Sequence, residues 1–134
     1  MAIPPPSCVS ILLCDAIHVD RVTGNSTIFN TFNIVFAKSF PARHPELTLF
    51  AELTDGRGRT PIDVRFLQLT ADAPDGIELL SATVHLEFND PRSVVAFFVR
   101  FSLLALPRAG EYHFVLESSG QFIARRRLTA EVRA

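Results

Sequence analysis

The stretch ELTLFAELT, residues 46–54, identifies the fold class of this chain. Leucine or alanine stands at each odd position, and glutamate or threonine stands at each even position except Phe50. A period of two places alternate side chains on opposite faces of a strand, whereas it would scatter the same apolar residues around a helix. The stretch therefore predicts a β-strand with one buried face.

The same alternation recurs along the chain between short turns. It is clearest in residues 80–88, and turn-forming clusters such as 23–26, 55–58, 72–76, 89–91 and 119–120 separate the runs. The expected strands are 8–20, 27–38, 46–54, 62–70, 80–88, 94–104, 111–118 and 121–131. About eight strands with short connections predict an all-β, antiparallel, two-sheet β-sandwich, because each sheet must bury its apolar face against another layer.

Size and composition predict one folded domain over residues 1–134. Apolar residues make up 48% of the 134 residues and charged residues only 20%, far from the composition of a disordered chain. The net charge of −1 gives no broad basic surface. Nucleic acid is therefore not expected as a partner.

The cysteines and the N-terminal segment predict a reducing, cytoplasmic setting. Cys8 and Cys14 lie six positions apart on one expected strand, so about 20 Å would separate them and no disulfide could form. Residues 1–7 lack the features of a secretory signal, and no run approaches the ~18 apolar residues that a membrane span requires. We expect free thiols, no membrane association and a cytoplasmic protein.

Several motifs carry a family resemblance. The run LLCDA at 12–16 leads to TGN at 23–25, FPARHP follows at 40–45, and PRAGEY at 107–112 is followed by GQF at 120–122. Over nearly the whole chain these segments resemble a bacterial family of small proteins known only as a domain of unknown function. The resemblance implies an immunoglobulin-like β-sandwich, and it transfers no catalytic residue.

Asp15 and Arg126 are the polar residues that the alternation directs inward. Asp15 falls among apolar residues at odd positions from Val9 to Val19. A buried carboxylate costs several kcal/mol unless it is paired, so Asp15 either accepts backbone hydrogen bonds at a bend or belongs to a site. Arg126 would point inward, whereas its neighbours Arg125 and Arg127 would point outward. Arg126 therefore either lies at a bulge or at the rim of the sandwich, or pairs with an acid such as Asp15.

Few residues suggest chemistry. His85 with Glu87, and His18 with Asp20, have the two-residue spacing of a metal or acid–base pair on one strand face, but neither has a third ligand nearby in sequence. No nucleophile motif or phosphate-binding loop is present in the sequence. We therefore expect no catalytic residue, cofactor or metal, and we expect the only tyrosine, Tyr112, in the core or in a corner hydrogen bond.

Two expected strands are apolar on both faces. In 94–101, alternate residues form one apolar face while Val94, Ala96 and Phe98 form the other, and Phe29 and Val35 lie on the second face of 27–38. A sandwich buries only one face of each strand, so another element or another subunit must cover the second.

The two apolar faces favour a non-catalytic interaction or structural module that binds copies of itself as a homo-oligomer. The alternative is a small enzyme, or a ligand- or metal-binding protein, in which the fold brings together Asp15, His18, His85 and Arg126. Convergence of these four side chains in a pocket would distinguish the second hypothesis from the first.

Overall fold

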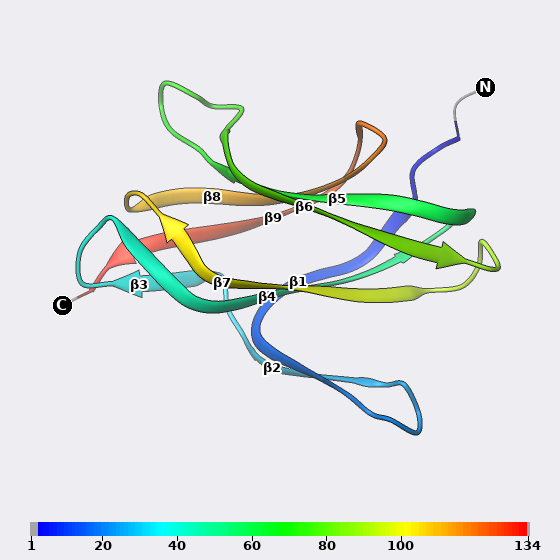
Figure 1. The fold of residues 1–134 in the computed structure, drawn as a ribbon. Coiled ribbons are helices and arrows are strands. Elements are labelled where there is room, and N and C mark those ends of the chain that lie inside the picture. The colour runs from blue at the N-terminus through cyan, green and yellow to red at the C-terminus, as the bar shows by residue number, and fades with distance from the viewer. Residues whose placement is uncertain (1–2, 134) are drawn as a thin grey trace.

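The computed structural model describes residues 3–133, which form an all-β fold of two sheets (Figure 1). The strands are β1 (Ser7–Val19), β2 (Ser26–Thr31), β3 (Ile34–Ala37), β4 (Ala42–Thr54), β5 (Gly58–Gln68), β6 (Ile77–Phe88), β7 (Val95–Leu106), β8 (Gly110–Ser118) and β9 (Gln121–Val132). The first sheet has the order β2-β1-β4-β7 and the second has the order β3-β9-β8-β5-β6. A helix that could cross a membrane is absent from residues 3–133.

The expected strand 27–38 is two strands in the structure, which makes nine strands where eight were predicted. β2 pairs with β1 in the first sheet, and β3 crosses to the second sheet, where it pairs in parallel with β9. All the other strand pairs are antiparallel, as predicted. Asn30, the next-to-last residue of β2, has a φ of 53°, in the left-handed region that asparagine tolerates better than most residues. The crossover begins after Thr31, the last residue of β2.

The crossover also overturns one surface prediction. Val35 was expected on an exposed apolar face with Phe29, but it is only 5% exposed and belongs to the core cluster. Its neighbours Ile34 and Phe36 are the exposed residues of β3. The alternation of side chains does not carry across a break between two sheets, because β3 takes its orientation from β9 rather than from β2.

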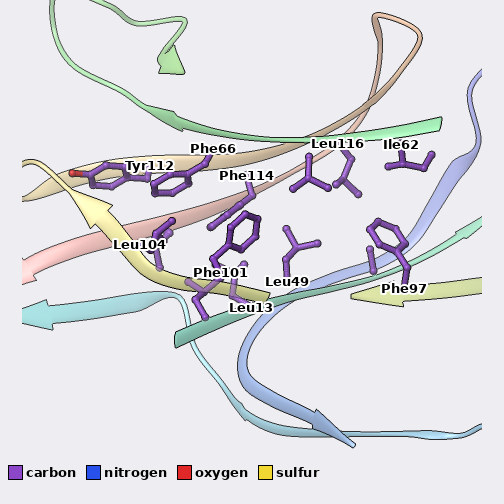
Figure 2. Close-up of a cluster of buried hydrophobic side chains, with 14 of the residues drawn as sticks. Leu13, Leu49, Ile62, Phe66, Phe97, Phe101, Leu104, Tyr112, Phe114 and Leu116 are labelled. Atoms are coloured by element: carbon purple, nitrogen blue, oxygen red, sulfur yellow. The ribbon is translucent and has the colours of Figure 1, made fainter. Parts of the chain in front are cut away.

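The core lies between the two sheets and is centred on aromatic side chains (Figure 2). Phe66 stacks on Tyr112 with ring centroids 5.3 Å apart, and Phe114 contacts Phe66 at 4.6 Å. The ring centroid of Phe101, in the first sheet, lies 5.4 Å from that of Phe114, in the second, so this pair packs the two sheets against each other. Full burial of each such side chain contributes about 1.5–3 kcal/mol.

Tyr112 also closes a corner at the start of β8. Its hydroxyl donates to the carbonyl oxygen of Arg108 at 2.6 Å and accepts from the Arg108 N–H at 3.2 Å. The ring is completely buried, and this burial raises the pKa of the phenol. The prediction of a core position or a corner hydrogen bond is confirmed, because Tyr112 has both.

The distal half of β1 and the whole of β2 extend beyond β4 as a two-stranded arm of the first sheet, residues 15–31. β1 pairs with β4 up to Cys14, and beyond that residue it pairs only with β2 (Figure 1). Asp20 closes the tip by accepting from the N–H groups of Val22 at 2.8 Å and Thr23 at 3.0 Å, and these bonds lower the pKa of its carboxyl group. Both cysteines are free thiols, as expected, and Cys14 at the root of the arm is buried.

Candidate interaction surface

The outer face of the first sheet carries a row of apolar side chains. Leu12, Phe50 and Phe98 are direct cross-strand neighbours on β1, β4 and β7. Phe98 is 42% exposed, and Val94, just before β7, is 53% exposed. Three of the residues predicted for a second apolar face, Val94, Ala96 and Phe98, therefore lie at the surface together.

The arm covers part of this face and leaves a groove of about 530 Å³. The arm contributes Ile28 and the turn residues 24–26, and the sheet contributes Phe50, Glu52, Val94 and Ala96. The arm accounts for the one misfit in the stretch at 46–54. Phe50 points away from the core between the sheets, yet it is only 5% exposed.

The arm presents apolar residues of its own. Phe29 pairs with Ala16, and Ile28 pairs with Ile17, so Phe29 and Ile28 point to opposite faces of the arm. Ile28 lines the groove, which leaves Phe29 on the face turned away from it, where it is exposed as predicted. Val22 at the tip is 93% exposed. A two-stranded hairpin has little stability of its own, so the arm depends on contacts that it makes with other surfaces.

Polar residues border the apolar row. Ser10 donates to Glu52 at 2.7 Å, and Arg100 lies 3.6 Å from Glu46 in an exposed ion pair. Such an exposed pair contributes little to stability. An apolar centre with a polar rim is the usual anatomy of a protein–protein interface.

Asp15, expected to be buried, is exposed. Its carboxylate accepts from the side-chain amide of Asn30 at 3.1 Å, across the two strands of the arm. The prediction of a buried acid is wrong because β1 extends beyond β4 directly after Cys14 and pairs only with β2 there. Alternation from that point on describes the two faces of the arm and no longer describes the core.

Arg126, the other inward polar residue, is half-buried on β9. Its guanidinium donates to the side-chain carbonyl of Asn33 at 2.5 Å. Arg126 does not pair with Asp15, which is bonded to Asn30 instead. A rim position beside the β2–β3 crossover describes it best.

The four residues of the enzyme hypothesis do not converge. Asp15 and His18 lie exposed on the arm, His85 lies exposed on β6 at one edge of the second sheet, and Arg126 lies on β9. β5 and β8 separate β6 from β9, which at about 4.8 Å per strand spacing amounts to roughly 14 Å. Among residues 3–133, no three His, Cys, Asp or Glu side chains gather in the geometry of a metal site.

The pair of His113 and Glu111 was not predicted from the sequence. His113 faces outward from the second sheet but is buried, with its Nε2 atom 2.7 Å from Glu111 Oε2. The Leu69 N–H, directly after β5, donates to the Glu111 carbonyl at 3.0 Å and so continues the pairing of β5 with β8 beside this pair. In the sequence, this pair could have been found from the spacing of Glu111 and His113, which stand two residues apart and so share one face of a strand. His85 and Glu87 have the same spacing, but they are exposed.

The fold has counterparts among solved structures. Three structures of β-glucosidase from Listeria innocua are similar to this chain. The complex with isofagomine is 9% identical, with a TM-score of 0.50 over 94% of this chain. The complex with glucose and a further structure are each 11% identical, with TM-scores of 0.48 over 74% of this chain. The likeness at this identity concerns the fold alone, and the matched regions cover 14–16% of the β-glucosidase chains.

The sequence comparisons place the chain in a family. No curated protein matches it at a significant level. The model of the family of unknown function DUF6941 matches residues 9–131, nearly the whole chain. The chain thus belongs to the DUF6941 family.

Proposed function

We propose that this protein is a non-catalytic interaction module that binds a second copy of itself through the outer face of its first sheet. The observation that supports the proposal is the exposed apolar surface of Val94, Ala96 and Phe98 beside the groove under the arm. Contiguous apolar patches are uncommon on monomeric proteins and usually mark interaction sites.

A second copy suits this surface because the chain presents two apolar elements on the same side. The sheet offers Val94 and Phe98, and the arm offers Phe29 and Val22. In a two-fold dimer the arm of each copy contacts the sheet of the other, so each element meets its counterpart. This arrangement also gives the arm the external contact that a two-stranded hairpin needs.

The immunoglobulin-like form of the sandwich belongs to the same proposal. Two features support it: β4 and β7 pair in one sheet while β5, β8 and β9 pair in the other, and the hydroxyl of Tyr112 bonds to the backbone four residues upstream. Both are typical of immunoglobulin-like domains. We also propose a bacterial, cytoplasmic setting, on the family resemblance and on the free thiols.

The rival hypothesis of a small enzyme or metal-binding protein loses its main support. It required Asp15, His18, His85 and Arg126 to meet in one pocket, and they lie on the arm and on separate strands of the second sheet. No other observation within residues 3–133 favours that function.

Mass measurement in solution tests the proposal. Light scattering during size-exclusion chromatography at micromolar concentration should give twice the chain mass of 14.9 kDa. Phe98→Asp should yield a monomer, because a carboxylate would be desolvated at the centre of the interface. Phe122→Asp, at an exposed aromatic residue on β9, is the matched control and should remain a dimer. A monomeric wild-type protein, or equal behaviour of the two variants, would contradict the proposal.

A further inference from the structure

A second surface depression lies on the other sheet, where β9 meets the crossover into β3. It has a volume of about 510 Å³ and is lined by Asn33, Ile34, Arg125, Arg126, Arg127 and Thr129. Each of its five polar side chains can donate hydrogen bonds, and none carries a carboxylate. The chemistry of the lining therefore suits an anion.

Asn33 is held in place by two hydrogen bonds. Its backbone carbonyl accepts from the Thr129 N–H at 2.9 Å, and its side-chain carbonyl accepts from Arg126 at 2.5 Å. Because the side-chain oxygen is occupied by Arg126, the amide presents its N–H donors to other groups. The Asn33 contacts also hold the Arg126 guanidinium at the depression rather than in bulk solvent.

The positive charge of the depression is poorly compensated. Arg126 is bonded to a neutral amide, and Arg125 makes no ion pair within residues 3–133. Arg127 lies 3.5 Å from Glu111, but that carboxylate is also bound by His113 at 2.7 Å. Within residues 3–133, Arg127 is the only one of the three arginines with an acid partner, and this acid lies outside the lining, so the depression keeps an excess of positive charge that favours binding of an anion.

We propose that this depression binds the phosphate group of a small phosphorylated ligand. Guanidinium groups bind phosphate oxygens in planar, two-point contacts. β3 pairs with β9 only from Thr129 onward, so at residues 125–128 this side of β9 has no partner strand, and Arg126 lines the depression from one face of β9 while Arg125, Arg127 and Thr129 line it from the other. The net charge of −1 argues against an extended nucleic-acid surface, but it does not oppose a local site of this size. The inference is independent of self-association, which involves the other sheet.

Isothermal titration calorimetry tests the site with pyrophosphate and inorganic phosphate as ligands and with citrate as a carboxylate of comparable charge. Pyrophosphate should bind most tightly. Replacing the two exposed arginines together, Arg125→Gln with Arg127→Gln, should weaken pyrophosphate binding at least about tenfold. Arg126→Lys keeps the charge but removes the planar fork, and it should weaken binding as well. Circular dichroism confirms that each variant is folded.

The control removes the same charge elsewhere. Arg21→Gln with Arg92→Gln changes two exposed arginines on the arm and on the turn before β7 and should leave the affinity for pyrophosphate unchanged. Equal weakening by the control pair would show that only net charge matters and would overturn the proposal. So would undetectable binding, or citrate binding as tight as pyrophosphate binding. The Arg125 and Arg127 double variant should keep the mass of the wild-type protein, which separates this test from that of the dimer.

Discussion

The guanidinium group of Arg43 donates to the backbone carbonyl of Leu103 at 3.0 Å. The register of β4 and β7 places Pro45 opposite Leu103, between the pairs His44 with Leu104 and Glu46 with Ser102. Proline has no N–H to contribute to the ladder, and the Arg43 side chain supplies a donor instead. Leu103 itself has a φ of 52°, a left-handed conformation that leucine adopts only at a cost.

This strain predicts that Leu103→Asn stabilises the protein. Asparagine tolerates a positive φ, and Leu103 is 58% exposed, so little apolar burial is lost. The free energy of unfolding from urea denaturation should rise by about 0.5–1 kcal/mol. Leu80→Asn, on the exposed part of β6, is the control and should give no gain. A destabilised Leu103→Asn protein would show that leucine is not strained at this position.

Removal of the Tyr112 hydroxyl tests the corner. In Tyr112→Phe the ring still fills the core, but the backbone groups of Arg108 lose their partner. The free energy of unfolding should fall by about 1–3 kcal/mol with an unchanged denaturant slope. A loss within the error of the urea measurement would mean that water replaces the hydroxyl at no cost.

Gly56 is required by the space that Phe88 occupies. A Cβ atom at Gly56 would lie 2.3 Å from the Phe88 ring, which is almost completely buried. Gly56→Ala should therefore destabilise the protein by about 1–3 kcal/mol. Combining it with Phe88→Leu should cost less than the sum of the two single changes, because the smaller side chain makes room for the methyl group. Strict additivity in thermal or urea unfolding would contradict this explanation.

The buried thiol of Cys14 predicts a dependence of stability on alkaline pH. Burial raises the pKa of Cys14, so the folded protein keeps a proton that the unfolded chain has already lost. Stability should therefore fall as pH rises above the pKa of an unfolded thiol, roughly 8.5. Burial acts in the same direction on Cys8, and on Tyr112 at higher pH. In Cys14→Ala the decline measured by urea denaturation at several pH values should be shallower, and an unchanged slope would exclude Cys14 as a source.

Alternation predicted the positions of the strands well wherever a strand stays within one sheet. Residues 46–54 and 80–88 lie within β4 and β6, and the inward leucines of β4 are all in the core. Alternation failed between Asp15 and Val35, where the chain extends beyond β4, forms the arm and then crosses into the second sheet. A period of two predicts which residues share a face of a strand, but it does not predict whether that face packs against the other sheet or is exposed to solvent.

The candidate sites show the same limit. Val94, Ala96 and Phe98 could be predicted because they are alternate residues of one short stretch, and Ala96 and Phe98 lie on β7. The groove beside them could not, because it requires Ile28 and Phe50 to meet through a bend in β1. Likewise, Asn33 and Arg126 are far apart in sequence, and only the parallel pairing of β3 with β9 brings them together.

That parallel pairing has a consequence for biosynthesis. β3 can dock only on β9, which leaves the ribosome long after β3 does. Until β9 is made, Val35 cannot be buried in the core, and the unpaired backbone N–H and C=O groups of β3 can form hydrogen bonds with other chains. The second sheet can therefore be completed only after β9 has been translated. A nascent chain that stalls before Thr129 leaves β3 unpaired and accessible to chaperones and proteases.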